Sequence, residues 1–210
     1  MPSLIGVAGG TGTGKSTVVR ALAERFGGVV VDLDSYYLDR SGIAVEERGR
    51  INYDEPAAID VRLLLDHLRR LAAGEMVAKP TYSFRDHARV GAQVVLPARL
   101  ILVDGLFTLW WEELRALLDL KVFVDVPADL RLARRIRRDV AERGRTADSV
   151  LAQYLSTVRP MHERYVEPTR VHADLVIANV GPIGAAVERV VAAVRMIANR
   201  PGVAVTGTPT

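Results

Sequence analysis

The residues best suited to chemistry form a glycine-rich run near the N-terminus: Gly9, Gly10, Thr11, Gly12, Thr13, Gly14, Lys15, Ser16 and, directly after it, Thr17. The run fits the pattern G-x-x-x-x-G-K-[ST] and lies between an apolar run at 4–8 and an amphipathic run at 15–26. Such glycines let backbone N–H groups converge on phosphate oxygens at the start of a helix. The lysine of this loop bridges the β- and γ-phosphates, and the serine hydroxyl is a Mg²⁺ ligand. We therefore predict that residues 9–17 bind the phosphates of ATP together with Mg²⁺.

Acidic residues follow two of the apolar runs. Asp104 ends the run at 100–103, where the second acid of such enzymes holds Mg²⁺ directly or through water. The alternative is that Asp104 caps the segment that follows. Asp34 follows the run at 29–33, and a carboxylate facing the γ-phosphate can accept the proton of an attacking hydroxyl. Asp32 competes for this role, but alternation along a strand puts both acids on one side, with Asp34 nearer the strand end. We predict Asp34 as the catalytic base, and Ser16, Asp104 and Asp34 at the metal.

Arginines are concentrated between residues 130 and 145. They are Arg131, Arg134, Arg135, Arg137, Arg138, Arg143 and Arg145. Spacings of three and four place several of them along one side of a helix, where they repel one another unless they face an anion. Arginines that close over a triphosphate neutralise the transferring group and exclude water. The segment therefore predicts a lid, and a solvated basic face remains the alternative for Arg131, Arg134 and Arg137.

Strand-like and helix-like runs alternate along the chain and must position these residues. Strands are expected at 4–8, 29–33, 100–103, 121–126 and 174–177, and a hairpin at 79–84 and 90–96. Helices are expected at 15–26, 59–73, 110–118, 130–142, from Gly144 to about 165, and at 183–198. This alternation predicts an α/β fold with a mostly parallel sheet covered on both faces. Ligands of such sheets bind at the carboxyl ends of the strands, where the glycine-rich run and both acids are expected.

The domain organisation follows from these elements. We expect one P-loop domain over residues 1–200, with a hairpin insertion at about 75–97 and lid helices at about 128–160. Residues 201–210 are rich in glycine, proline and threonine and are expected to be a flexible tail.

Composition narrows the class of protein. The formal net charge of +3 is small for a dedicated nucleic-acid binder, and the absence of cysteine excludes thiolate chemistry. No apolar run reaches the roughly 18 residues that span a bilayer. The N-terminal residues do not have the pattern of a signal peptide. We therefore expect a cytoplasmic protein that binds neither membranes nor nucleic acids.

Several short segments accompany the glycine-rich run in a recognisable order. They are Asp34-Ser35-Tyr36-Tyr37, Asn52-Tyr53-Asp54-Glu55-Pro56, Pro80-Thr81-Tyr82-Ser83-Phe84 with His87, Asp104-Gly105, Arg134-Arg135-Ile136-Arg137-Arg138-Asp139, Glu142-Arg143-Gly144-Arg145, Gln153-Tyr154, Val158-Arg159-Pro160-Met161, Glu167-Pro168-Thr169 and Ala173-Asp174. With them the chain resembles the uridine kinase (uridine–cytidine kinase) family of P-loop kinases over about residues 3–178. The resemblance implies ATP-dependent phosphorylation of the 5′-hydroxyl of uridine and cytidine.

The resemblance also implies roles for single positions on the sugar side. Asp34 would activate the ribose 5′-hydroxyl. Asp54 and Arg135 would bind the 2′- and 3′-hydroxyls, with Gln153 and Arg145 nearby. A site that requires both hydroxyls would select ribonucleosides over deoxyribonucleosides.

The same resemblance implies which residues bind the pyrimidine base and the phosphates. Tyr82 and His87 would read the pyrimidine edge, and three aromatic residues would wall the base: Tyr37, Tyr53 and Phe84. The lid arginines would clamp the phosphates: Arg138, Arg143 and Arg145, with Arg138 and Lys15 stabilising the transferring group. The family further implies a homo-oligomer, specifically a tetramer, and a place in pyrimidine salvage.

Three positions depart from the family pattern. Ser83 stands where an aspartate usually follows the pocket tyrosine, and Asp104 where relatives often have glutamate. The shorter reach of Asp104 favours a water between its carboxylate and Mg²⁺. The segment 178–182 lacks the Pro-Arg-Gly-type turn expected near the adenine, so the sequence leaves ATP-versus-GTP preference open.

Other functions remain as alternatives. A related kinase could phosphorylate another small acceptor, such as ribulose-5-phosphate or pantothenate. A nucleotide-dependent switch or a nucleic-acid binder that uses the arginine helix is a more distant alternative, since neither needs Asp34 as a base. The sequence leaves open uridine versus cytidine preference, oligomeric state and feedback by CTP or UTP.

Overall fold

A computed structural model describes residues 2–48 and 51–198. Its central sheet has five parallel strands in the order β2-β5-β1-β6-β7. The strands are β1 (Ser3–Ala8), β2 (Val29–Asp32), β5 (Leu100–Asp104), β6 (Leu120–Asp125) and β7 (Leu175–Ala178). The predicted tail at 201–210 lies outside the described residues.

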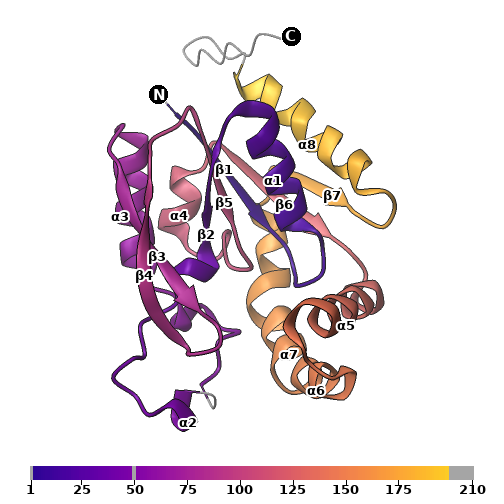
Figure 1. The fold of residues 1–210 in the computed structure, drawn as a ribbon. Helices are drawn as coiled ribbons and strands as arrows, with labels where there is room; N and C mark the ends of the chain where they lie inside the picture. The colour runs from indigo at the N-terminus through magenta and orange to yellow at the C-terminus, as the bar shows by residue number, and fades with distance from the viewer. Residues whose placement is uncertain (1, 49–50, 199–210) are drawn as a thin grey trace.

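Alternate residues of each strand point to opposite sides of the sheet. Both faces are buried, because helices cover each of them. In β1, Ile5 and Val7 pack into one apolar cluster, and Leu4 and Ala8 pack into the other. The first cluster is covered by α1 (Lys15–Phe26) and α8 (Ile183–Ala198). The second is covered by α3 (Val61–Ala72) and α4 (Glu112–Leu117) (Figure 1). The predicted α/β fold, a parallel sheet flanked by helices, is confirmed.

The observed helix boundaries show where local sequence signals predicted the ends of the helices correctly. Helix α1 has the predicted limits because Gly14 (φ 85°) precedes it and Gly27 (φ 62°) ends it, both in the left-handed conformation. Helix α3 begins at Val61 rather than at the predicted 59, because the Asp60 side chain accepts a hydrogen bond from the Leu63 N–H at 3.2 Å and so caps it. Helix α4 is shorter than the predicted 110–118.

The predicted hairpin forms a separate two-stranded antiparallel sheet, β3 (Val77–Ser83) and β4 (Ala88–Val95). Both strands begin two residues earlier than predicted, since Val77 pairs with Val95 and is buried in the core, and Ala88 pairs with Ser83 and is buried too. The hairpin lies against α3 and beside the turn that follows β2 (Figure 1).

The arginine-rich segment is helical over a longer stretch than the predicted 128–160. It comprises α5 (Ala128–Arg143), α6 (Ala147–Gln153), a π-helical stretch (Tyr154–Val158), α7 (Arg159–Met161), a second π-helical stretch (His162–Val166) and a 3₁₀ helix (Glu167–His172). A regular helix was predicted from Gly144 to about 165. Pro160 lacks an N–H donor and crowds the preceding turn, which fits the widened turns around it.

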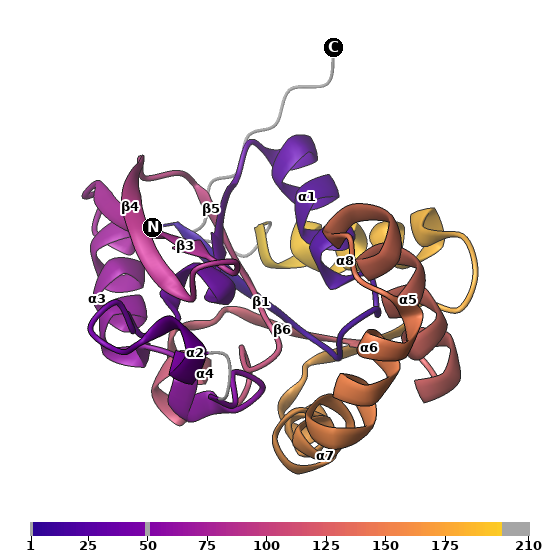
Figure 2. The ribbon, with the colours of Figure 1, turned by 60° about the horizontal axis from the view of Figure 1, so that its bottom comes forward.

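Short elements complete the fold. They are a 3₁₀ turn after β2 (Leu33–Tyr36), α2 (Val45–Arg48) and a 3₁₀ turn (Pro56–Ala58). Seen from the carboxyl ends of the strands, the hairpin and helices α5–α7 lie on opposite sides of this edge (Figure 2). In the described part of the chain, no helix combines the length and apolarity needed to cross a bilayer.

Candidate active site

The glycine-rich loop connects β1 to α1 at the carboxyl edge of the sheet. The Thr13 hydroxyl donates a hydrogen bond to the Gly10 carbonyl at 2.8 Å, which braces the loop internally. Gly12 has φ 77°, and a Cβ there would lie 2.4 Å from the carbonyl oxygen of Arg131, so only glycine fits beneath α5. Lys15, Ser16 and Thr17 follow in the first turn of α1, with Ser16 and Thr17 exposed. This arrangement presents helix N–H groups, an ammonium and a hydroxyl to one site.

Residues far along the chain hold the loop from outside. The Asn179 side-chain amide donates to the Thr13 carbonyl at 2.7 Å, and Asn179 is buried. Arg134 donates to the backbone oxygen of Asn179 at 2.9 Å. Arg131 is buried with its Nε bonded to the Val126 carbonyl and its guanidinium against Gly10. Arg131 and Arg134 therefore stabilise the loop rather than form a solvated face.

Asp32 and Asp34 have different surroundings. Strand β2 ends at Asp32, whose Oδ1 accepts from the Ser35 N–H at 2.8 Å and the Ser35 hydroxyl at 2.6 Å. Its other oxygen pairs with the Lys79 ammonium of β3. Asp34 lies on the 3₁₀ turn, so the predicted strand alternation does not extend to it and the geometric argument for its side was wrong. Asp32 is occupied as a cap and ion-pair partner, although it lines the same hollow as Asp34.

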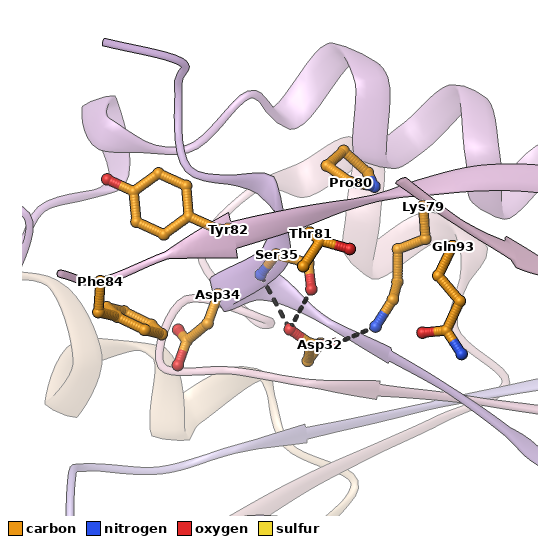
Figure 3. A pocket seen from close by; sticks show the side chains of 9 residues that line it. All are labelled: Asp32, Asp34, Ser35, Lys79, Pro80, Thr81, Tyr82, Phe84 and Gln93. Atoms are coloured by element: carbon orange, nitrogen blue, oxygen red, sulfur yellow. Dashed lines mark hydrogen bonds and ion pairs between the residues drawn. The ribbon is translucent and has the colours of Figure 1, made fainter. Parts of the chain in front are cut away.

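The hollow lies between the turn after β2 and the hairpin (Figure 3). Its lining residues are Asp32, Asp34, Ser35, Lys79, Pro80, Thr81, Tyr82, Phe84 and Gln93. The Asp34 carboxylate points into the space beside the Phe84 ring. The structure thus brings Asp34, the predicted catalytic base, together with Tyr82 and Phe84, two of the aromatic residues predicted to contact the pyrimidine.

The electrostatic surroundings of Asp34 favour proton uptake. The side chain is open to the hollow but densely surrounded by protein on its other sides, and this desolvation raises its pKa above the ordinary 3.8. Lys15 opposes the rise, while the negative charges of Asp104 and Asp32 add to it. A carboxylate with a raised pKa is a better proton acceptor than an exposed one.

Asp104 ends β5 beside β1 and β2, and its side chain is buried. Its Oδ1 has no hydrogen-bond partner among the described residues, as expected of an oxygen that serves a cation or its water. Among the residues that the structure describes, no group of three or more His, Cys, Asp or Glu side chains could hold a metal ion by itself. Mg²⁺ suits such a site, because it keeps several waters and takes phosphate oxygens beside one or two protein ligands. The unpartnered Asp104 oxygen and the exposed Ser16 hydroxyl are of the donor types that Mg²⁺ takes.

The lid arginines gather around one buried carboxylate, that of Asp139. Arg138 contacts it at 2.8 Å, Arg143 at 3.5 Å and Arg145 at 3.7 Å. Arg143 also lies over the Phe84 ring, with 6.0 Å between the guanidinium carbon and the ring centre. The three arginines predicted to clamp phosphates are thus brought together.

The predicted sugar-binding residues form a second group. Arg135 donates to Gln153 Oε1 at 2.9 Å, and Arg145 donates to the same oxygen at 2.5 Å. Asp54 accepts from the Thr157 hydroxyl at 3.1 Å, and Arg135 acts on Asp54 through its charge rather than through a direct contact. Burial raises the pKa of Asp54.

Five predicted pocket rings form one cluster: Tyr37, Tyr53, Tyr82, Phe84 and His87. The Tyr53 and His87 rings stack with centroids 4.7 Å apart, and the buried Tyr37 contacts three of the other rings. The buried hydroxyls of Tyr53 and Tyr82 lie near each other but lack a hydrogen-bond partner of good geometry in the described residues. Only Tyr82 and Phe84 line the hollow.

Comparison with known proteins assigns the chain to a family. The profile of the Phosphoribulokinase / Uridine kinase family matches residues 4–184. The chain belongs to this family. A uridine kinase of Clostridium novyi is 44% identical over 200 residues, which cover 93% of this chain and 96% of that protein. A uridine kinase of Brevibacillus brevis is 48% identical over 184 residues, or 86% of each chain.

Solved structures agree with the fold. A protein from Silicibacter sp. TM1040, suggested to be a fructose transport system kinase, is 26% identical with a TM-score of 0.70 and covers 84% of this chain and 89% of its own. Shikimate kinase from Acinetobacter baumannii shares the fold alone, at 17% identity and a TM-score of 0.52, with coverage of 95% and 97%. As a member of this kinase family the chain is a phosphotransferase with ATP as phosphate donor. The names of its relatives do not favour pantothenate or ribulose-5-phosphate as the acceptor.

No role was predicted from the sequence for Asp139, Thr157 or Asn179, each of which contacts a residue of this kinase's site. Asp139 belongs to a segment that was noted only because it resembles the family, and Asn179 to a segment noted only because it departs from the family pattern. Thr157 carried no signal, because its contact with Asp54 joins residues 103 positions apart.

Proposed function

We propose that the protein phosphorylates the 5′-hydroxyl of uridine and cytidine with ATP, giving UMP and CMP for pyrimidine salvage in the cytoplasm. The observation that carries this proposal is the position of Asp34. Its carboxylate is influenced by the Lys15 charge of the phosphate loop and lies in the same hollow as Tyr82 and Phe84. A base at this junction can reach a hydroxyl presented to the γ-phosphate.

The nucleoside is proposed to enter between the hairpin and the core. Its base packs among the hairpin aromatic rings, with Tyr82 and His87 at the pyrimidine edge. His87 has φ 49°, a left-handed conformation that is uncommon outside glycine, and it ends the hairpin turn between β3 and β4. Because imidazole can donate or accept a hydrogen bond, His87 suits both uracil and cytosine.

The ribose is proposed to lie between Asp54 and Arg135. Gln153 and Thr157 orient these two side chains from the lid, since Gln153 bonds to Arg135 and Thr157 bonds to Asp54. A carboxylate and a guanidinium that interact through charge without a direct contact suit a pair of neighbouring hydroxyls. This arrangement predicts a preference for ribonucleosides.

In the proposed reaction Asp34 accepts the 5′-hydroxyl proton while the nucleoside oxygen attacks the γ-phosphorus. Lys15 and the lid arginines at 138, 143 and 145 neutralise charge on the transferring group. Bound Mg²⁺ would supply further charge neutralisation, held through Asp104 and Ser16. The lid excludes water, so that ATP is not hydrolysed.

The protein is further proposed to assemble as a homo-oligomer, in line with the tetramer implied by resemblance. Four apolar residues at or beside the outer part of the hairpin are 58–62% exposed: Met76, Val90, Val94 and Leu96. Exposed apolar groups in one region suit an interface between subunits. Light scattering after size exclusion measures the mass, and a 23.0 kDa monomer at micromolar concentration would contradict this part.

A coupled ADP-release assay tests the function. Uridine, cytidine, their 2′-deoxy forms, ribulose-5-phosphate and pantothenate are compared with ATP or GTP as donor. The proposal predicts turnover with uridine and cytidine and at least about tenfold lower kcat/KM for the deoxynucleosides. Turnover with ribulose-5-phosphate or pantothenate but not with a pyrimidine ribonucleoside would contradict it.

A further inference from the structure

Asp139 is a fully buried carboxylate on α5 with four guanidinium groups around it. Arg138 contacts Oδ1 through Nε and Nη2, both at 2.8 Å, and Arg143 lies 3.5 Å from the same oxygen. Arg135 and Arg145 lie 3.6 and 3.7 Å from Oδ2. No other acidic side chain contacts any of the four within salt-bridge distance in the described residues.

The backbone of Asp139 fixes the turn that returns the chain to this cluster. Gly144 adopts φ 62° and ends α5, and its N–H donates to the Asp139 carbonyl. The Arg145 N–H donates to the same carbonyl at 3.2 Å. Arg143 and Arg145 thus flank a turn anchored on the Asp139 backbone. Both guanidinium groups also form ion pairs with the Asp139 carboxylate.

The charges of the cluster do not balance. One negative charge faces four positive charges, so the group has an excess of three and repels itself in the absence of an anion. A buried carboxylate without cationic partners is strongly unfavourable, so Asp139 and the arginines stabilise each other. The remaining excess is available to a triphosphate.

The four arginines serve two sides of the site. Arg135 extends to Gln153 and, at 3.3 Å, to the Thr11 hydroxyl of the phosphate loop. Arg143 extends to Phe84 of the hairpin. Asp139 is therefore the shared partner of arginines that lie on the acceptor side, at Gln153 and Phe84, and of one that also reaches the phosphate loop at Thr11.

We propose that Asp139 is the positioning residue of the lid, which gathers four mutually repelling arginines into one array before the substrates bind. It contacts no substrate and acts only through the arginines. The acceptor half of this inference rests on the proposed nucleoside kinase function, and the phosphate half does not.

Asp139→Asn tests the role, because it removes the charge and keeps the shape. Asp129→Asn is the matched control, since Asp129 is an exposed carboxylate in the first turn of the same helix. We expect KM for ATP and KM for uridine each to rise about tenfold or more in Asp139→Asn, the usual worth of a hydrogen bond to a charged group. Asp129→Asn should stay within about twofold of the wild type.

A merely structural role gives a different result. If Asp139→Asn only lowers the folded fraction, apparent kcat falls and both KM values stay unchanged, which would overturn the proposal. If Asp139→Asn does not fold, Asp139→Glu keeps the charge but displaces it by one methylene. Folded Asp139→Glu with wild-type KM values for both substrates would overturn the proposal, and raised values for both would support it.

Calorimetry without an acceptor separates this inference from the proposed function. The non-hydrolysable analogue AMP-PNP with Mg²⁺ should bind about tenfold or more weakly to Asp139→Asn than to the wild type. This comparison remains valid if the wild type phosphorylates neither uridine nor cytidine. Equal affinity in the two proteins would overturn the phosphate half.

Discussion

The guanidinium carbon of Arg143 lies 6.0 Å from the centre of the Phe84 ring, so the arginine lid meets the hairpin across the site. These two elements are on opposite sides of the carboxyl edge of the sheet (Figure 2). The hollow that contains Asp34 lies on the hairpin side of this contact, and Phe84 is part of its lining. The contact joins the element proposed to hold phosphate to the element proposed to hold the base, so changes at Phe84 should affect acceptor binding first.

Phe84→Ala should raise KM for uridine about tenfold and leave KM for ATP within about threefold, because stacking on a base is worth roughly 1–3 kcal/mol. Steady-state kinetics with each substrate varied in turn measures both values. Arg85→Ala is the control, since Arg85 is the exposed neighbour on the same hairpin turn and is outside the lining of the hollow. Equal KM values for uridine in the two variants would argue against base stacking on Phe84.

Asn179→Ala should act on the donor instead. The change leaves the buried Thr13 carbonyl without its 2.7 Å partner, a loss of about 1–3 kcal/mol that loosens the phosphate loop. We expect KM for ATP to rise about tenfold and KM for uridine to stay unchanged. Arg134→Ala, which removes only the contact with the Asn179 backbone, should have a smaller effect. An increase confined to KM for uridine would show that Asn179 does not support the phosphate loop.

Asp32→Asn should shift the pH dependence. Desolvation by the surrounding protein raises the pKa of Asp34, and the negative charges of Asp104 and Asp32 add to the rise. The base works only when deprotonated, so kcat/KM should fall on the acid side at a pKa above 3.8. Asp32→Asn removes one of the charges that raise this pKa and frees Lys79, so the acid limb should move to lower pH. Asp66→Asn on α3, an exposed carboxylate, should leave it in place, and a shift of Asp32→Asn to higher pH would contradict the assignment.

Local signals predicted the parts of the site that are contiguous in sequence. Gly14 and Gly27 fix both ends of α1, so the phosphate loop and its helix could be placed to the residue. Asp104 could be placed because it directly ends a buried apolar run. In such stretches the pattern of glycine and apolar residues is itself the physical cause of the structure.

Long-range contacts could not be predicted in this way. Asn179 supports Thr13 across 166 positions, and no local pattern connects the two. Asp34 was chosen over Asp32 by extending strand alternation, although the chain leaves the strand at Leu33, where the Asp32 side chain caps a 3₁₀ turn. Asp139 looked like one more charged residue on a basic helix until its burial among four arginines was visible.

Asp34→Asn tests the central claim most directly. The measurement is kcat at saturating uridine and ATP near pH 7, with KM for uridine and the unfolding temperature determined in parallel. The account predicts that kcat falls by about 10²–10⁴, while KM stays within about threefold and the protein remains folded. A folded Asp34→Asn variant that turns over within about threefold of the wild type would show that the base lies elsewhere.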